Sequence, residues 1–571
     1  MNDKTIFDAE PGHNEKAVRI ETADDYPGGH IRGLETSDET RLHRGLKARH
    51  ITMIAIGGAL GTGLIVGTGK ALASAGPGSL FISYSFIGCL VFMVMAALGE
   101  MAAWIPLSSG FTGYATRYCH PSLGFALGWS YLCKYLVLVP NQLTAAALVI
   151  QFWDPQQKIN PGVWIAIFLV LIISINYFGG IGFFGEFEFW LSSFKVIIMV
   201  GIILFALVIA CGGGPDHDAR GFRYWSNPGA FASPSYSSGS LGKFLGFWSV
   251  MVNATFAFLG TELVGVTAGE AQNPRKSIPK AIRLTFYRIL VFYILSVLFV
   301  GMIVPYNSKA LLDAVKAGSK GASAAASPFV AAATVAGINT LPSIINVCIL
   351  IFVFSASNSD LYIASRTLYG LASDESAPRI FRRTDSRGVP IYALAVASLF
   401  ACLSFMNVSS NSKVVFGYFV NLTTIFGLLT WISILVTYIF FLRARRAQNI
   451  PDSAMPYTAP QGIIGTAIAL FFCCLIALTK NFDVFIHTPE RKFAYTDFIT
   501  GYIGIPVYLI WIFGHMFFTK SRGVKPHEAD FYTGKSIIDA EENEYLEQLK
   551  LDRIQSTGAR KFYHRYISWL F

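Results

Sequence analysis

Charged side chains stand inside several stretches of this chain that are otherwise apolar. Lys134 lies in KYLVLVPNQL, Lys195 in WLSSFKVII and Glu262 in FAFLGTELVG. An ionisable group inside a membrane costs about 3 kcal/mol on insertion scales, so each such group needs a partner or a task. A buried lysine or carboxylate can also exchange a proton within the physiological pH range. These three residues are therefore candidates for ion pairing, for binding a charged ligand and for carrying a proton.

Glycines gather in two of the apolar stretches. The segment IGGALGTGLIVGTG, residues 56–69, contains six glycines, and FAFLGTELVG contains Gly260 and Gly265. A glycine weakens a helix by about 1 kcal/mol relative to alanine, so each cluster predicts a helix break. A broken helix exposes N–H groups that suit a carboxylate and C=O groups that suit an ammonium. Two breaks together suit a zwitterionic α-amino acid. Close helix packing through small residues is the alternative.

Membrane-spanning helices are expected to position these groups. The 571 residues are 53% hydrophobic and only 14% charged, whereas soluble domains carry about a quarter charged residues. A helix needs about 20 apolar residues to cross the bilayer core. On that criterion the sequence predicts twelve spans, at residues 51–72, 79–105, 123–152, 161–179, 189–211, 245–268, 286–305, 340–372, 389–407, 413–441, 462–480 and 497–518.

The two glycine clusters fall in the first and sixth predicted spans, five spans apart. This spacing predicts an all-α membrane protein with twelve transmembrane helices, a 5+5 inverted repeat with broken helices 1 and 6, and two further helices. The expected units are a cytosolic disordered tail, the first repeat, an extracellular loop, the second repeat, helices 11 and 12 and a cytosolic tail. Their boundaries are 1–48, 49–211, 212–244, 245–441, 442–518 and 519–571. In the last unit, DAEENEYLEQLKLDR predicts a short helix.

Charge placement argues against a nucleic-acid partner despite the formal net charge of +10. Basic loops such as NPRKSIPKAIR and RARR fall on one side if the spans alternate, and the positive-inside rule makes that side cytosolic. An even number of spans then places both termini in the cytosol. Most of the eight cysteines lie in apolar runs, which indicates packing residues rather than disulfides. No phosphate loop, metal-ligand spacing or activated nucleophile is present, so neither an enzyme nor a cofactor is expected.

Five stretches resemble the fungal amino acid permeases (the yeast amino acid transporter family) of the amino acid–polyamine–cation superfamily. They are ARHITMIAIGGALGTGLIVGTG, GEMAAWIPLSSGFTGYATRY, FFGEFEFWLSSFKVI, GEAQNPRKSIPKAI and SNSDLYIASRTLYGLA. Two more, KYLVLVPNQLTAAALVIQFW and GGGPDHDARGFRYWSNPGAF, are similar to the branch that takes up dicarboxylic amino acids. The resemblance implies a proton-coupled plasma-membrane symporter that imports L-glutamate and L-aspartate by alternating access. A general or neutral amino acid permease and a non-transporting amino acid sensor are the alternatives.

The resemblance also implies a substrate site at the two breaks. Residues of the first break would cradle the α-carboxylate, backbone carbonyls at both breaks would receive the ammonium group, and one of two phenylalanines would cover the substrate. The carboxylate cradle is Gly61, Thr62 and Gly63, the carbonyls lie near Ala59, Leu60, Phe256 and Leu259, and the covering ring is Phe256 or Phe258. Ordinary packing is the alternative role for both phenylalanines.

Lys134 and Gln142 depart from the pattern of the relatives. Lys134 lies about 16 Å into its span at 1.5 Å per residue, which is too deep for it to reach either surface. Many relatives carry a neutral polar residue at this position and a glutamate where this chain has Gln142. Both departures make the site more positive, so Lys134 is predicted to attract the second carboxylate of the substrate, with neutral support from Gln142. The alternative pairs Lys134 with Glu262 and gives it no contact with the substrate.

Lys195 and Glu262 are the candidates for proton coupling. Relatives without sodium dependence carry a lysine at the position of Lys195, where its ammonium takes the place of a sodium ion. Snorkelling of Lys195 to the cytosolic surface is the alternative. Glu262 matches a family glutamate beside the second break, and bonding to loose backbone amides is its structural role.

Three further expectations concern charged residues outside the predicted site. Asp360 and Arg366, six residues apart in one span, are expected to compensate each other's charge. Glu188 is expected at the membrane interface. Exposed lysines of the tails are candidate acceptors for ubiquitin ligases, namely Lys4, Lys16 and Lys47 and the lysines after Lys520.

Overall fold

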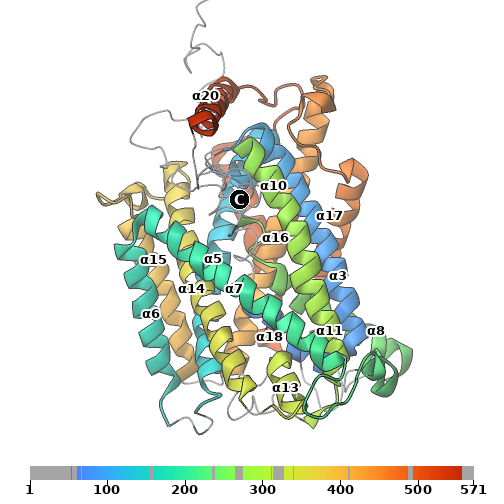
Figure 1. Ribbon diagram of the computed structural model, residues 1–571. Helices are drawn as coiled ribbons and strands as arrows, with labels where there is room; N and C mark the ends of the chain where they lie inside the picture. The colour runs from blue at the N-terminus through green and yellow to red at the C-terminus, as the bar shows by residue number, and fades with distance from the viewer. Residues whose placement is uncertain are drawn as a thin grey trace, which may run out of the picture.

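The protein is a bundle of helices in a computed structural model (Figure 1). The structure describes residues 53, 61–65, 67–107, 109–154, 156, 158–233, 238–263, 274–309, 311–312, 327–338, 340–408, 412–486 and 493–555. Ten helices within these ranges are long and apolar enough to cross a membrane. The structure therefore agrees with an all-α membrane protein.

The first half of the bundle contains six α-helices in the described ranges. They are α2 (Thr62–Ile65), α3 (Gly67–Trp104), α4 (Phe111–Tyr118), α5 (Pro121–Ile150), α6 (Pro161–Phe178) and α7 (Gly180–Ala210). Non-helical backbone at Gly76, with φ of 84° and ψ of 170°, divides α3 into two helices. Helices α5 and α6 both begin at a proline, which suits the first helical turn because its N–H has no partner there.

The second half contains the remaining described α-helices. They are α8 (Gly239–Phe258), α10 (Pro274–Arg288), α11 (Leu295–Ile303), α13 (Pro328–Val335), α14 (Leu341–Ser373), α15 (Ile391–Ala401), α16 (Ser412–Ala447), α17 (Gly462–Thr479), α18 (Tyr495–Tyr502), α19 (Gly504–Thr519) and α20 (Lys535–Gln555). A π-helical segment, Ile289–Ile294, joins α10 to α11, and the three form one continuous candidate span. The predicted helix in the C-terminal tail is confirmed by α20.

The described helices follow the predicted spans closely, with two differences. The predicted span at 389–407 is shorter than the others, because α15 passes into a 3₁₀ segment, and the apolar helix extends over Ile391–Met406. Much of the predicted span at 51–72 lies outside the described residues, and its described part consists of α2 and the start of α3.

Helix α5 lies at the centre of the bundle. In the most apolar 18-residue window of α5, 83% is buried inside the bundle, whereas only 28% is buried in the corresponding windows of α6 and α17. The outer helices expose large apolar side chains, such as Trp190 at 70% and Ile464 at 75%. Such faces suit contact with lipid, where exposed apolar surface has no cost. The helices that surround α5 therefore shield the polar groups that it carries from the lipid.

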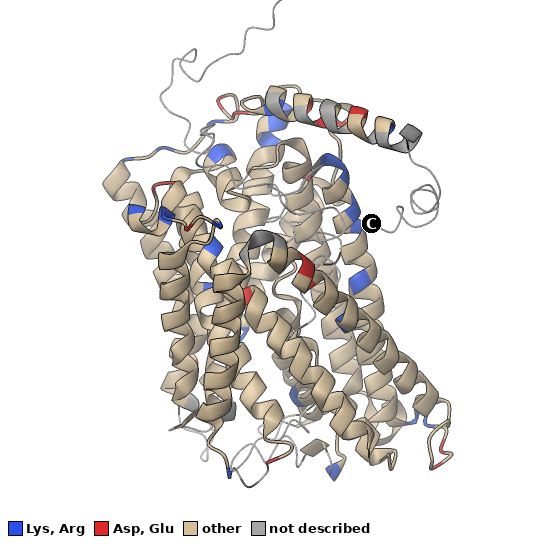
Figure 2. Cartoon of the chain, turned by 60° about the vertical axis from the view of Figure 1, so that its left-hand side comes forward, with Lys and Arg blue, Asp and Glu red and all other residues tan. Residues whose placement is uncertain are grey.

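Lysines and arginines gather mainly at the end of the bundle that carries α20 (Figure 2). The segment before α20 packs there against α4 and α16. Phe531 is fully buried between the rings of Tyr118 and Phe441, at centroid distances of 5.1 and 5.3 Å. Arg117 forms an ion pair of 2.9 Å with Asp530. The C-terminal segment thus ties α4 to the end of α16.

Candidate functional site

A break in the helical backbone follows α8, inside the predicted span at 245–268. Helix α8 ends at Phe258, and Leu259 is extended, with φ of −61° and ψ of 146°. Gly260 has a φ of 90°, a conformation that glycine adopts without the strain of a side chain. At the break the carbonyl of Phe256 accepts from the N–H of Leu259 at 3.3 Å, and the carbonyl of Phe258 accepts from the N–H and the hydroxyl of Thr261 at 3.4 and 2.6 Å. The Phe256 carbonyl keeps a second lone pair that an ammonium group can use.

The short helix α2 lies directly against the end of α8. A Cβ atom added at Gly63 would stand 2.5 Å from the Cα atom of Ala257 and 2.9 Å from its backbone nitrogen. Only glycine allows this approach, because no real Cβ contact is that short. Ala59 and Leu60, which the sequence analysis placed in the site, lie outside the described residues.

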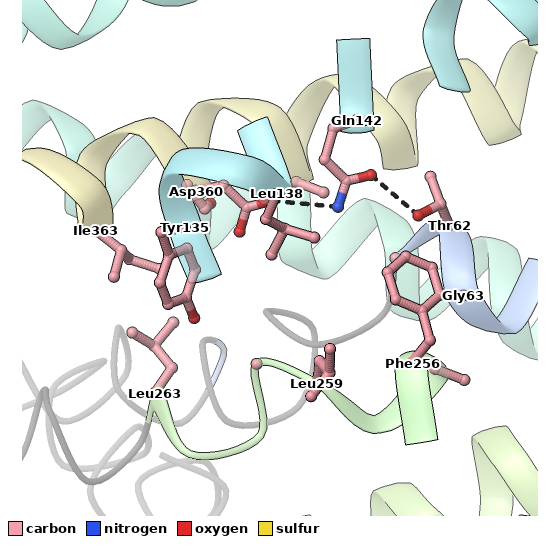
Figure 3. Close-up of a pocket in the computed structure, with 15 residues that line it drawn as sticks. Thr62, Gly63, Tyr135, Leu138, Gln142, Phe256, Leu259, Leu263, Asp360 and Ile363 are labelled. Carbon is pink, nitrogen blue, oxygen red and sulfur yellow. Dashed lines mark hydrogen bonds between the residues drawn. The ribbon is translucent and has the colours of Figure 1, made fainter. Parts of the chain in front are cut away.

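A cavity of about 490 Å³, counting its open mouth, lies between these two segments, α5 and α14 (Figure 3). It is lined by Gly61, Thr62, Gly63, Tyr135, Leu138, Gln142, Phe256, Ala257, Leu259, Gly260, Leu263, Ala356, Ser359, Asp360 and Ile363. Six residues of the predicted site are among them: Gly61, Thr62 and Gly63 at α2, Phe256 and Leu259 at the end of α8, and Gln142 on α5.

A chain of hydrogen bonds crosses one wall of the cavity. The hydroxyl of Thr62 donates to Oε1 of Gln142 at 3.0 Å, and Nε2 of Gln142 donates to Oδ2 of Asp360 at 3.2 Å (Figure 3). The three side chains are 1%, 5% and 7% exposed. Because the amide oxygen and nitrogen each have one partner, the orientation of Gln142 is fixed. The chain links α2, α5 and α14.

Asp360 is the site residue that the sequence analysis missed. It was expected to compensate the charge of Arg366, and that expectation is wrong. The Asp360 carboxylate faces the cavity, whereas the Arg366 guanidinium lies 5.2 Å from the ring centroid of Tyr362. A signal was present in the sequence, because Ala356, Asp360 and Ile363 follow the spacing of one helix face and all line the cavity.

Lys134 is paired with Glu262 and does not line the cavity. Both side chains are fully buried, and their charged atoms are in direct contact. The indole of Trp431 donates to Oε2 of Glu262 at 3.3 Å. The ring centroids of Tyr131 and Tyr135 lie 5.1 and 4.7 Å from the Lys134 ammonium. This is the arrangement of the alternative interpretation, and a contact of Lys134 with substrate stays a prediction.

Lys195 is buried on α7 and pairs with Glu188 at 3.4 Å. Its side chain does not reach the surface, so snorkelling does not explain it. Glu188 also accepts hydrogen bonds from Ser192 at 3.1 Å and from Ser355 on α14 at 3.2 Å. The expectation of an interfacial Glu188 is wrong, since only 2% of its side chain is exposed. The hydrogen bond from Ser355 to Glu188 ties α7 to α14.

The two candidate phenylalanines differ in their surroundings. Phe256 lines the cavity and packs edge-on against Phe416, with ring centroids 6.2 Å apart. Phe258 stacks on Tyr293 at 4.4 Å and is fully buried away from the cavity lining. Phe256 is therefore placed to cover a ligand, and Phe258 has the packing role.

Comparison with known proteins places this geometry in a family. The model of the amino acid permease family matches residues 50–527. The chain belongs to the amino acid permease family. The permease is thus a membrane transporter and not an enzyme.

The permease is similar to curated fungal proteins along most of its length. It is 54% identical to the dicarboxylic amino acid permease of Saccharomyces cerevisiae over 94% of this chain and 87% of that protein. It is 41% identical to the basic amino-acid permease of the same organism, over 84% and 82% of the two chains. It is 39% identical to the proline-specific permease of Emericella nidulans, over 88% and 90%.

Solved structures of distant sequence share the fold. The permease matches a mutant manganese transporter of Eremococcus coleocola with a TM-score of 0.52 and 13% identity, over 83% of this chain and 94% of that one. At that identity the match concerns the fold alone.

Proposed function

We propose that the permease is a proton-coupled symporter of the plasma membrane that imports L-glutamate and L-aspartate by alternating access. The observation that carries this proposal is the 54% identity to a dicarboxylic amino acid permease over 94% of the chain. The cavity between α2 and the end of α8 supports it, because backbone N–H and C=O groups at these chain segments can bind the two charged groups of a zwitterion. The proposed architecture is the twelve-span 5+5 inverted repeat with two further helices.

The substrate's amino acid moiety binds at the two breaks. Backbone N–H groups around Gly61 and Gly63 hold the α-carboxylate, and the carbonyls near Phe256 and Leu259 receive the ammonium group. Phe256 covers the bound substrate from the α8 side. This arrangement leaves the substrate's side chain to extend toward Gln142 and Asp360 on the opposite wall.

Ion pairs on the helices around the cavity couple binding to movement. Protonation of Glu188 or deprotonation of Lys195 would break the ion pair within α7 that orients the Glu188 carboxylate toward Ser355 of α14, and this is the predicted role of Lys195 in proton coupling. Glu262 holds the break after α8 to α5 through Lys134. A rearrangement at the break would therefore act through this ion pair on α5, the central helix.

The end of the bundle with most lysines and arginines faces the cytosol in this proposal (Figure 2). Both termini are then cytosolic, and the tail lysines are accessible to ubiquitin ligases. Equal surface residence of the protein after replacing these lysines by arginine would contradict a role in turnover.

A general or neutral amino acid permease is the second candidate, and one observation favours it. Asp360 is the only charged side chain among the described residues that line the cavity, so the lining offers no cation to a second substrate carboxylate. The experiment that decides is uptake of labelled L-glutamate at acidic external pH in cells lacking their own carriers. Competition by aspartate but not by leucine, at a checked surface amount of protein, supports the acidic-substrate proposal.

Two other outcomes of this experiment assign different functions. Equal competition by leucine supports the general permease. Binding of glutamate without net uptake supports the amino acid sensor.

A further inference from the structure

The cavity contains a carboxylate where an acidic substrate would bring another. Asp360 is 7% exposed, and Nε2 of Gln142 donates to its Oδ2. No described group donates a hydrogen bond to its Oδ1, and Asp360 belongs to no ion pair of the described residues. An ionised carboxylate in such a place is costly unless it gains a proton or a cation.

The cations near Asp360 are already engaged with other carboxylates. Lys134 on α5 pairs with Glu262, and Lys195 on α7 pairs with Glu188. The charges of three of these groups act on Asp360 through space, namely Lys134, Lys195 and Glu188. The hydroxyls of Tyr131 and Tyr135 on α5 also interact electrostatically with Asp360. Arg288 donates to Thr261 at 2.9 Å and interacts with Glu262. Counted as ionised, the two lysine–carboxylate pairs are neutral, Arg288 adds a positive charge beside Glu262, and Asp360 adds a negative charge to the cavity lining.

Two carboxylates that share a small, water-poor site do not both ionise, because the charges repel each other strongly there. One proton held between them removes the repulsion and forms a hydrogen bond, as in the paired aspartates of aspartic proteases. In the cavity, Gln142 fixes Oδ2 of Asp360 as an acceptor, so Oδ1 is the atom left to hold a proton. A protonated Oδ1 can then donate to a second carboxylate.

We infer that Asp360 binds the co-transported proton and shares it with the side-chain carboxylate of the acidic substrate. This inference rests on the proposed function and adds the site and the reason for the coupling. The proton enters with the substrate from the outside and is bound on Oδ1. It leaves to the cytosol when the substrate carboxylate departs, and no covalent bond forms or breaks other than the O–H bonds of this exchange.

The inference also explains why the site needs no cation for the second carboxylate. One proton neutralises the pair formed by the substrate and Asp360, so the two lysines can remain in their ion pairs. A neutral amide substrate such as L-glutamine needs no proton, because its NH₂ group donates directly to ionised Asp360. The proton requirement is therefore specific to acidic substrates.

The test compares the full-length permease with Asp360→Asn and with Asp374→Asn, in proteoliposomes. Asp374 is the residue that follows the end of α14, so its replacement is the same chemical change outside the cavity. Initial glutamate uptake is measured from pH 5 to pH 8 without a gradient, and accumulation is measured with an inward proton gradient. L-Glutamine uptake is recorded in parallel.

Wild type and Asp374→Asn are expected to lose glutamate uptake by about tenfold per pH unit above the titration of the shared proton, since one proton is required. Asp360→Asn is expected to take up glutamate with less than a twofold change over the same range and to equilibrate it without accumulation. An Asp360→Asn variant that keeps the wild-type pH profile and accumulates glutamate overturns the inference.

Binding measurements decide the case in which Asp360→Asn binds substrate but transports nothing. The probe is L-glutamate added to the purified full-length variant, with thermal stabilisation as readout at pH 5, 6, 7 and 8. Binding independent of pH supports the inference, and binding as pH-dependent as in wild type overturns it. Loss of both glutamate and glutamine binding also overturns it, because Asp360 would then hold the substrate ammonium or the fold. If wild type itself transports no glutamate while it does transport glutamine, the proposed function fails separately.

Discussion

The buried pair of Lys134 and Glu262 gives the sharpest prediction of stability. In Lys134→Gln, Glu262 loses its partner cation and keeps only the hydrogen bond from Trp431 in a fully buried site. Removing one partner of a buried ion pair costs about 3–5 kcal/mol, because an unpaired charge remains in a medium of low polarity. Two cation–π contacts with Tyr131 and Tyr135 are lost as well, so we expect the upper part of this range.

The double variant Lys134→Gln with Glu262→Gln separates charge from shape. Both charges disappear together, and the two amides can hydrogen-bond to each other. We expect its stability to lie within about 2 kcal/mol of wild type, since removing both charges leaves neither unpaired. The control is Arg223→Gln, which breaks an exposed ion pair with Asp218 and is expected to leave stability unchanged.

Stability is measured as the fraction of monodisperse protein that remains after heating in detergent, for all four proteins side by side. The reasoning is refuted if Lys134→Gln is as stable as wild type, or if the double variant is as unstable as the single one. Glutamate uptake by the double variant also tests the predicted substrate role of Lys134. Normal affinity for glutamate without the lysine would refute that role and leave Lys134 as a structural residue.

Three further predictions concern packing and pH. Gly63→Ala is expected to lose surface expression and uptake, because its Cβ would meet the Ala257 backbone at 2.5 Å, whereas Gly61→Ala meets no atom within 4 Å and should still reach the surface. Burial raises the pKa of Asp374, just beyond the end of α14, to about 6. The folded protein is therefore most stable with this carboxyl protonated, and that contribution to stability is lost as the pH rises from about 4 to about 6. Asp374→Asn should remove this loss of about 3 kcal/mol, which thermal unfolding in detergent at pH 4 and pH 7.5 measures. Phe531→Ala should release the C-terminal segment from α4, because the buried ring that packs against Tyr118 is lost. Added protease should then cleave the tail faster than in wild type, and an unchanged cleavage rate would contradict this prediction.

Apolar runs predict most of the helices in this chain, because a span must satisfy its backbone groups internally and present apolar side chains to lipid. The glycine at 260 likewise marks the break after α8, since the left-handed backbone there favours a residue without a side chain. These are local properties of the sequence. They position the cavity without specifying which polar groups face it.

Pairing of buried charged side chains was harder to predict, because it depends on the rotation and the depth of each helix. Glu188 was predicted at the membrane interface because the predicted span began at residue 189. Helix α7 begins at Gly180 instead, so Glu188 lies more than two turns from the start of the helix. Its partner Lys195 lies seven residues later, two turns along the same face. Asp360 was assigned to Arg366 by closeness in sequence, although six residues place two side chains on different faces of a helix.

The most direct test of acidic amino acid symport uses purified permease in proteoliposomes that contain a pH-sensitive dye. L-Glutamate is added outside with no imposed proton gradient, and the internal pH is followed while labelled glutamate inside is counted. The account predicts that glutamate and aspartate enter and acidify the lumen, and that leucine does neither. Entry of glutamate without acidification, or equal entry and acidification with leucine, would contradict it.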